Sequence, residues 1–502
     1  MMERKHRRKF TMLATIWVWL VTQSSASGPS SSKPHIIFLL ADDLGWYDVS
    51  WHNPKAITPN MEELANEGII LEQSYVQPLC TPTRSALLSG RYPFTIGRQG
   101  PPLMNQVPTG LLLNATILPE AMKAAGYSTH AVGKWHLGFC HWDYTPTRRG
   151  FDTFYGLYTG MGDHYSHDSY ASLSETGPRG YDFRKNEDPD FSVNGTYDTF
   201  VYANYVEDLL YSRDPAVPMF LYLAFQSIHS PMQVPDEYRD PFRYIGDENR
   251  EISLGMSYAM DDAIGRVVAH LKATGHYENS IIIFSSDNGG APGNGINWPL
   301  RGGKSTLWEG GTRAPGFIHS PLLTKIGFKS QTLLHVTDWY ATLVGLAGGS
   351  VPENTDGFDQ WEALTQDAVS PRTSFVYNLN SGFNSTGLSG AIRKGEYKLL
   401  VGVKGGQWIE PPEGFDEHEP INDGGACEIS GENETIELYN VIDDPEERND
   451  IAELYPEIVA EMLEDLEREF ERLAPVDNPP ADLSSDPKFF DGLWSPGWCE
   501  PQ

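Results

Sequence analysis

The chain has 502 residues, of which 40% are hydrophobic and 12% aromatic, and this composition excludes a disordered chain. Its formal net charge of −31 argues against nucleic acid as a partner and means that an anionic substrate would need a local basic pocket. Because the length exceeds the usual size of one hydrophobic core, we expect a large domain and a smaller one.

The N-terminus has the pattern of a secretory signal peptide. A basic segment (MMERKHRRKF) precedes a short apolar stretch (TMLATIWVWLV) and small residues suited to cleavage, so we expect residues 1–27 to be removed. A membrane-spanning helix needs about 20 apolar residues, and we expect no transmembrane segment after this removal. Four glycosylation sequons, at Asn114, Asn194, Asn384 and Asn433, agree with a secretory-pathway protein, either lysosomal or extracellular.

Three short apolar runs have the pattern of buried strands, namely residues 35–43 (HIIFLLADD), 219–231 (MFLYLAFQSIHSP) and 280–290 (SIIIFSSDNGG). Helical patterns lie between them, at residues 58–67, 118–125 and 256–274. This alternation predicts an α/β sheet that is covered by helices on both faces. Functional side chains gather at the carboxyl ends of strands in such sheets, and that is where the polar residues of each run stand.

The pattern changes after about residue 350. Residues 374–380 (SFVYNLN) and 390–402 (GAIRKGEYKLLVG) are typical of antiparallel strands. Residues 455–473 then place apolar side chains on one face of an amphipathic helix. We therefore predict a large domain over residues 34–350 and a smaller α+β domain over residues 351–502.

Cys80 lies in an unusual setting, within the segment PLCTPTRSALLSGRY. A proline near the start and a glycine at the end bound a short helix over residues 83–89, with Cys80 at its N-terminal mouth. The free N–H groups and the dipole of a helix make such a mouth an anion site. Arg84 and Arg91 could add positive charge there.

The sequence leaves the state of this cysteine open. Cys80 could be half of a disulfide, a plain buried thiol or a precursor of another group. If it is set aside, Cys140, Cys427 and Cys499 allow one bridge at most and leave one thiol over.

The run Cys-x-Pro-Thr-x-Arg followed by ALLSGRY resembles the signature of type I sulfatases. The resemblance implies an alkaline-phosphatase-like fold with a central, mostly parallel sheet. It also implies that the formylglycine-generating enzyme oxidises Cys80 to formylglycine during maturation. In that family one hydroxyl of the hydrated aldehyde attacks sulfur, and the other lets the sulfated intermediate collapse back to the aldehyde.

Two further segments resemble the metal motifs of the same family. LLADDLGWYDV implies Asp42 and Asp43 as ligands, SSDNGG implies Asp287 and Asn288, and the modified Cys80 would complete the set. Oxygen ligands favour a hard cation, so we expect one Ca²⁺, or else Mg²⁺, rather than zinc.

The remaining catalytic residues are also implied by the resemblance. Lys134 and Lys304 would contact sulfate, Arg84 would support the formylglycine, His136 would bind or deprotonate its hydroxyls, and His229 would protonate the leaving alcohol. His164 and His167, in GDHYSHDSY, are further candidates for the substrate mouth, without a catalytic role.

Several phrases resemble the arylsulfatase B, I and J group in particular, among them GKWHLGF, PTRRGFDTFYG, QSIHSPMQVP and LRGGKSTLWEGGTR. This resemblance implies a sulfuric ester hydrolase that removes the 4-sulfate of N-acetylgalactosamine from dermatan or chondroitin sulfate, and that also accepts an aryl sulfate. Two alternatives remain. One is a formylglycine-type phosphate or phosphonate monoester hydrolase, and the other is a secreted glycan-binding pseudoenzyme without catalysis.

Overall fold

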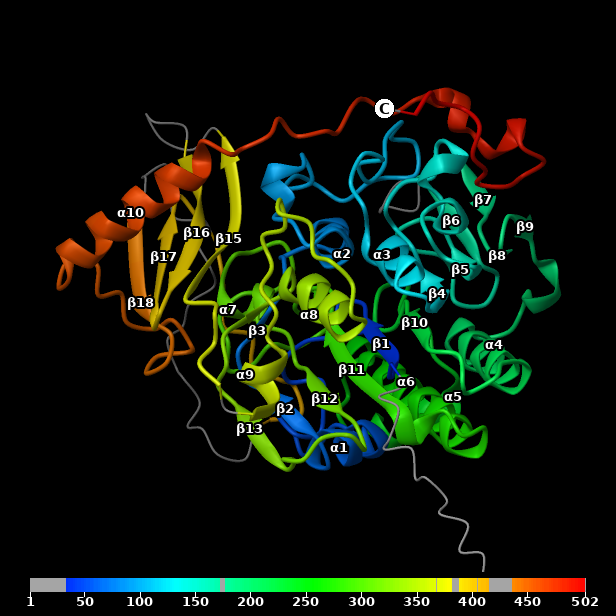
Figure 1. The fold of residues 1–502 in the computed structure, drawn as a ribbon, viewed down its shortest axis with the longest axis horizontal. Coiled ribbons are helices and arrows are strands. Elements are labelled where there is room, and N and C mark those ends of the chain that lie inside the picture. The colour runs from blue at the N-terminus through cyan, green and yellow to red at the C-terminus, as the bar shows by residue number, and fades with distance from the viewer. Residues whose placement is uncertain are drawn as a thin grey trace, which may run out of the picture. The chain divides into compact units, whose positions relative to one another are not determined.

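The structure is a computed structural model that describes residues 33–171, 177–366, 368–381, 388–403, 405–414 and 436–501. In this part of the chain the largest sheet has ten strands in the order β13-β2-β12-β11-β1-β10-β4-β5-β8-β9 (Figure 1). The strands are β1 (His35–Ala41), β2 (Ile69–Leu71), β4 (Ser128–Lys134), β5 (Thr153–Leu157), β8 (Arg184–Lys185), β9 (Asp188–Pro189), β10 (Met219–Ala224), β11 (Ser280–Ser286), β12 (Phe317–His319) and β13 (Phe328–Ser330). The expected signal peptide lies outside the described residues.

The centre of this sheet is parallel. Strand β1 pairs in parallel with both β10 and β11, β10 pairs with β4, and β4 pairs with β5. Antiparallel pairs occur towards the edges, where β12 joins β11 to β2 and where β8 follows β5. The predicted fold class is therefore confirmed, and the three apolar runs form the adjacent strands β10, β1 and β11.

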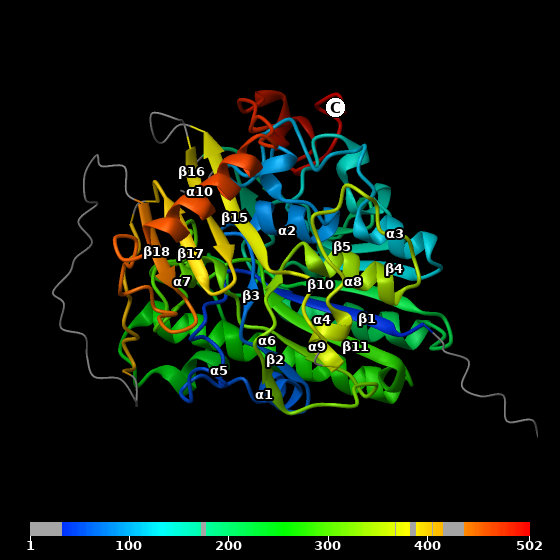
Figure 2. The same ribbon diagram turned by 60° about the vertical axis from the view of Figure 1, so that its left-hand side comes forward.

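Helices cover both faces of the sheet (Figure 2). Alternate residues of β1 point to opposite faces. Ile36 and Phe38 pack with α2 (Cys80–Ser89), α3 (Leu118–Ala124) and α8 (Asp338–Leu346). Ile37 and Leu39 pack with α1 (Pro59–Asn66), α4 (Asp198–Ser212) and α6 (Glu248–Ala273). The helices predicted over residues 58–67 and 118–125 are thus confirmed as α1 and α3.

The predicted helix over residues 256–274 starts earlier than expected. Helix α6 begins at Glu248, because the side chain of Asp247 accepts a hydrogen bond of 2.9 Å from the backbone N–H of Arg250 and caps the helix. The short elements that complete the described main domain are β3 (Ser74–Tyr75), β6 (Asp168–Tyr170), β7 (Arg179–Tyr181), β14 (Leu334–His335), α5 (Asp236–Arg239) and α7 (Glu309–Thr312).

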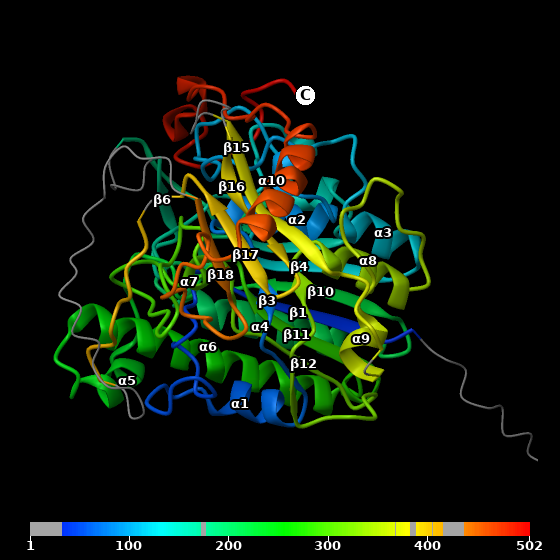
Figure 3. The ribbon, with the colours of Figure 1, turned by 90° about the vertical axis from the view of Figure 1, so that its left-hand side faces the viewer.

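The described C-terminal part forms a second, antiparallel sheet in the order β15-β16-β17-β18. Helix α9 (Trp361–Gln366) precedes β15 (Ser374–Ser381), β16 (Leu388–Lys394), β17 (Tyr397–Val401) and β18 (Ile436–Asn440), and α10 (Pro456–Phe470) follows them. Figure 3 shows α10 lying over this sheet. The predicted strands and the amphipathic helix are confirmed, whereas β18 was not predicted. The domain boundary at residue 350 stays a prediction.

After α10 the chain runs back towards β6 and β7, as the red segment in Figure 1 shows. A disulfide joins Cys140 to Cys499, which is the single bridge that the cysteine count allowed. Cys427 lies outside the described residues. Among the residues that are described, no helix is both long enough and apolar enough to cross a membrane.

Candidate active site

The carboxyl ends of four neighbouring parallel strands bring the candidate residues together. Asp42 follows β1 directly, Lys134 is the last residue of β4, and Asp287 follows β11 directly. His229 stands in the loop after β10. Because these strands are parallel, their carboxyl ends meet at one edge of the sheet, which is the usual place for a site in this architecture.

The expected metal ligands lie close together and are buried. One ligand atom from each of Asp42, Asp43 and Cys80, and one from His229, which was not expected as a ligand, all lie within 4.8 Å of one another. Asp287 Oδ1 accepts a hydrogen bond of 3.3 Å from the backbone N–H of Asp43. The remaining expected ligand, Asn288, donates through Nδ2 to Asp43 Oδ1 at 2.8 Å.

These residues fit a hard cation. The other side-chain atom of Asn288, its carbonyl Oδ1, is buried and has no hydrogen-bond partner among the described residues. An unpartnered buried acceptor is costly, and it becomes a ligand if a cation lies between it and the carboxylates. Carboxylate and amide oxygens are the ligands that Ca²⁺ and Mg²⁺ prefer.

Three basic side chains oppose the three carboxylates. Lys134 Nζ lies 2.6 Å from Asp42 Oδ2, and Lys304 Nζ lies 2.7 Å from the Asp43 carboxylate. Arg84 donates through Nη2 to Asp287 Oδ2 at 2.8 Å and through Nη1 to the carbonyl oxygen of Lys134 at 3.1 Å. The cations that an anionic substrate requires are therefore gathered at the site, each paired with a carboxylate.

Burial and charge shift the carboxyl pKa values in opposite directions. Burial, reinforced by Asp287, raises the pKa of Asp42 to about 7. Burial also disfavours the charged form of Asp43, but Lys304 and His229 outweigh it and hold the pKa of Asp43 below its usual range. One carboxyl thus binds a proton readily, while its neighbour stays ionised.

Cys80 is the first residue of α2, so this helix starts earlier than the predicted residue 83. Its Sγ lies 3.6 Å from Asp42 Oδ1. Burial and the nearby Asp287 raise the pKa of the thiol, so Cys80 is not a reactive thiolate, and it is free of any disulfide. Arg91 follows the opposite end of α2, so of the two arginines only Arg84 reaches the site.

The two expected catalytic histidines are buried beside these groups. His229 Nε2 lies 3.8 Å from Asp43 Oδ2, and burial together with Lys304 lowers the pKa of His229 to about 3. Burial and Lys134 likewise lower the pKa of His136, which is therefore neutral. Both His136 and Asp43 have positive φ angles, of 56° and 61°. That conformation costs roughly 1–2 kcal/mol per residue and is retained at functional sites.

His164 and His167, the further candidates for the substrate mouth, line neither the cavity above Cys80 nor the one beside it. Both are buried. His164 Nδ1 lies 3.0 Å from Asp198 Oδ1, and its Nε2 lies 3.1 Å from the carbonyl oxygen of His229. His164 therefore holds the loop that carries His229, while His167 packs against Phe183.

A cavity of about 280 Å³ opens above Cys80. It is lined by Leu79, Cys80, Pro101, Pro102, Leu103, Met104, Asn105, His136, Gly160, Met161, Tyr170, His229, Lys304 and Ser305. Lys304 contributes a charge to its lining, and most of its walls are apolar. The wall formed by residues 101–105 was not predicted, because a loop without a periodic pattern gives no sequence signal.

Comparisons with known proteins agree with this geometry. The family model described as Sulfatase matches residues 34–350. Arylsulfatase J of Mus musculus is 42% identical over 494 residues, which cover 95% of this chain and 82% of that protein. N-acetylgalactosamine-6-sulfatase of Sus scrofa is 30% identical over 465 residues, which cover 87% of this chain and 85% of that protein.

Solved structures share the fold. The crystal structure of Ps i-CgsB in complex with k-i-k-neocarrahexaose superimposes with a TM-score of 0.75 at 26% identity, over 92% of this chain and 99% of that one. The phosphonate monoester hydrolase SpPMH from Silicibacter pomeroyi has a TM-score of 0.58 at 17% identity, over 88% of this chain and 96% of that one, and this likeness shows the fold alone. The chain belongs to the sulfatase family, within its arylsulfatase group, and is a sulfuric ester hydrolase.

Proposed function

We propose that this enzyme removes the 4-sulfate of N-acetylgalactosamine from dermatan or chondroitin sulfate, using a formylglycine made from Cys80. A relative that is named N-acetylgalactosamine-6-sulfatase supports the class of sugar, and the phrases shared with the arylsulfatase B group support position 4. The observation that carries the proposal is the place of Cys80, which starts α2 with its Sγ 3.6 Å from Asp42 Oδ1. No other cysteine is so placed among the described residues.

The basic residues of the site would bind and orient the sulfate ester. Lys304 lines the cavity and would meet the sulfate oxygens first, while Lys134 lies deeper. Fixed positive charges of this kind stabilise the negative charge that develops on sulfuryl oxygens during the reaction. Arg84 would hold Asp287 and the end of β4 in place through its hydrogen bonds.

The two histidines would move protons. Burial lowers the pKa of His136 and keeps it neutral, so it has a free ring nitrogen that would accept a proton from a formylglycine hydroxyl, although the lowered pKa makes it a weak base. His229 would donate a proton to the leaving alcohol. Its low pKa applies to the protein alone, and the negative charge of a bound sulfate ester would raise that pKa towards the range of a general acid.

Asp42, Asp43, Asp287 and Asn288 would hold one Ca²⁺ or Mg²⁺, together with an oxygen of the formylglycine that replaces the Cys80 sulfur. Such an ion would polarise a sulfate oxygen. Because Cys80 is buried in the folded chain, the formylglycine-generating enzyme would have to act before the chain folds.

The secretory pathway, with a lysosomal or extracellular destination, is part of the same proposal. The sequons at Asn114 and Asn194 are exposed and open to glycosylation. The sequons at Asn384 and Asn433 lie outside the described residues. Glycosidase treatment of the secreted protein, followed by peptide mass mapping, would test occupancy of the two exposed sites.

The first test is the mass of the tryptic peptide that contains Cys80, from protein made in cells with an active formylglycine-generating enzyme. We expect an aldehyde or its hydrate. We also expect Cys80→Ala to abolish aryl sulfate hydrolysis while leaving the unfolding transition nearly unchanged. An unmodified thiol in active protein would overturn the formylglycine proposal.

The substrate is tested separately. Oligosaccharides ending in 4-sulfated or 6-sulfated N-acetylgalactosamine should differ in kcat/KM, in favour of the 4-sulfated one. A preference for aryl phosphate over aryl sulfate would instead favour the phosphate or phosphonate hydrolase alternative.

A further inference from the structure

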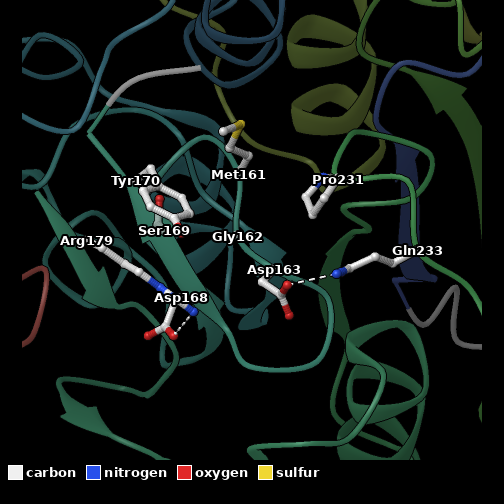
Figure 4. A pocket seen from close by; sticks show the side chains of 9 residues that line it. All are labelled: Met161, Gly162, Asp163, Asp168, Ser169, Tyr170, Arg179, Pro231 and Gln233. Atoms are coloured by element: carbon white, nitrogen blue, oxygen red, sulfur yellow. Dashed lines mark hydrogen bonds and ion pairs between the residues drawn. The ribbon is translucent and has the colours of Figure 1, made fainter. Parts of the chain in front are cut away.

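A second cavity, of about 270 Å³, shares lining residues with the one above Cys80, and Figure 4 shows the side chains that line this second cavity. It is lined by Met161, Gly162, Asp163, Asp168, Ser169, Tyr170, Arg179, Pro231 and Gln233. Met161 and Tyr170 line both cavities, so the two are neighbours. The other residues that line the second cavity have no role in the proposed reaction.

One wall of the second cavity is the hairpin of β6 and β7. Tyr170 and Arg179 are direct partners in its register. Arg179 Nη2 donates to Asp168 Oδ2 at 2.6 Å, and its guanidinium carbon lies 5.3 Å from the centre of the Tyr170 ring. The guanidinium is thus held in one orientation, while its side chain remains 49% exposed and has N–H groups left to donate.

The opposite wall is formed by Asp163 and Gln233, as Figure 4 shows. Asp163 Oδ1 accepts hydrogen bonds from the backbone N–H groups of Tyr165 and Ser166, at 3.0 and 2.7 Å. Its Oδ2 accepts from Gln233 Nε2 at 2.8 Å, and Gln233 Oε1 accepts from the backbone N–H of His164 at 2.9 Å. Both polar walls are therefore preorganised before any ligand binds.

We propose that the second cavity is the subsite for the sugar ring next to the sulfated one, and that it recognises this ring through its hydroxyl groups. The inference rests on the proposed glycan substrate. Carboxylates on both walls accept from hydroxyls, Arg179 donates to them, and the Tyr170 ring offers an apolar surface to a sugar face. The walls above Cys80 are mostly apolar by contrast, so they suit a sugar face or an aryl ring but hold few hydroxyls.

The charge of the subsite limits which ligands it can bind. Its described lining contains two carboxylates, Asp163 and Asp168, and one cation, Arg179. The ring next to N-acetylgalactosamine in dermatan or chondroitin sulfate is a uronic acid, and the exposed N–H groups of Arg179 can pair with its single carboxylate. A sulfate on the same ring would add negative charge that no further cation of the described lining meets, beside two carboxylates that repel it. The ligand class is therefore an oligosaccharide whose second ring carries hydroxyls, one carboxylate and no sulfate.

The test compares three substrates of the active enzyme: an aryl sulfate, N-acetylgalactosamine 4-sulfate, and a trisaccharide with a single 4-sulfated terminal ring. We expect Arg179→Ala to raise KM for the trisaccharide roughly tenfold, since charged hydrogen bonds are lost. KM for the two small substrates should stay within about twofold of the unaltered enzyme. Arg243→Ala is the matched control, because Arg243 is 48% exposed, pairs with Asp240 at 2.7 Å and lines neither cavity.

The outcomes separate this inference from the proposed function. An unchanged KM for the trisaccharide, or an equal rise for all three substrates, would overturn the subsite. Turnover of the aryl sulfate but not of the trisaccharide would overturn it too, and would leave the sulfatase chemistry intact. A trisaccharide with a sulfated second ring that binds as tightly as the singly sulfated one would contradict the charge argument.

Discussion

At the scale of single residues, the two active-site lysines differ in access. The side chain of Lys134 is fully buried, whereas that of Lys304 is 15% exposed and lines the cavity above Cys80. We therefore expect Lys304→Ala to lower kcat/KM for an aryl sulfate by roughly 10²–10³, the usual effect of removing one group that stabilises developing negative charge. Lys329→Ala is the control, because Lys329 also pairs with a carboxylate, Glu72, at 2.8 Å. A similar loss in both variants would contradict a direct role for Lys304.

The apolar pattern alone marks the residues at strand ends, whereas His229 and Lys304, which lie on loops, were predicted only from the family resemblance, and the loop residues 101–105 were not predicted. Asp42 and Asp287 each follow a continuous apolar run, so the pattern itself marks the edge of the sheet. Tertiary contacts bring the loop residues to the site. Asn105, for example, donates to Ser169 Oγ at 2.9 Å across 64 residues of sequence, and no local pattern indicates that contact.

At the scale of elements, a buried charge cluster joins β17 of the C-terminal sheet to helix α7. Lys398 of β17 lies 3.0 Å from Glu309 of α7 and 2.7 Å from Glu447, and all three side chains are inaccessible to solvent or nearly so. Two carboxyls thus share one ammonium group. Burial, reinforced by Glu309, raises the pKa of Glu447 to about 7, so the folded protein retains a proton there under mildly acidic conditions.

This cluster predicts a pH dependence of stability. The folded-state pKa of Glu447, about 7, lies above the usual value of 4.5. Its contribution to the free energy of unfolding is therefore fully present below about pH 4.5 and is lost as the pH rises through about 7. Between about pH 4.5 and about pH 7 the free energy of unfolding, measured by urea unfolding, should decline in the unaltered protein. We expect this decline to be smaller in Glu447→Gln, whose side chain cannot ionise. Glu461→Gln, at an exposed carboxyl, should leave the decline unchanged. If the free energy of unfolding falls equally with pH in the unaltered protein and in both variants, Glu447 is not the group responsible.

At the scale of the whole molecule, the interior of the main sheet was predictable and its periphery was not. Strands β1, β10 and β11 are continuous apolar runs, because both of their faces are buried. Strand β4 contains buried polar residues and a glycine, Gly133, where an added Cβ would lie 1.9 Å from the carbonyl oxygen of Ala224. The glycine allows the close approach of β10, and the segment lacks the continuous apolar pattern by which the other central strands were predicted. Strands of two or three residues near the edges of the sheet, such as β8 and β12, are too short to show a sequence pattern.

The C-terminal segment after α10 connects distant parts of the molecule to the proposed subsite. Trp494 Nε1 donates to the carbonyl oxygen of Ser169 in β6 at 2.9 Å, and the disulfide between Cys140 and Cys499 fixes the chain shortly beyond it. This bond closes a sequence separation of 359 residues. We expect the double variant Cys140→Ala and Cys499→Ala to lose roughly 2–5 kcal/mol of stability.

The same double variant should also loosen β6, because the segment that supports it is no longer fastened. KM for the sulfated trisaccharide should then rise, while KM for an aryl sulfate stays unchanged, since Cys80 and its partners are held by the main sheet and α2. Thermal unfolding and the two KM values measure the two effects separately. An equal rise in KM for the trisaccharide and for the aryl sulfate would mean that the C-terminal segment supports the whole site. A loss of stability with both KM values unchanged would mean that Trp494 positions β6 without help from the disulfide.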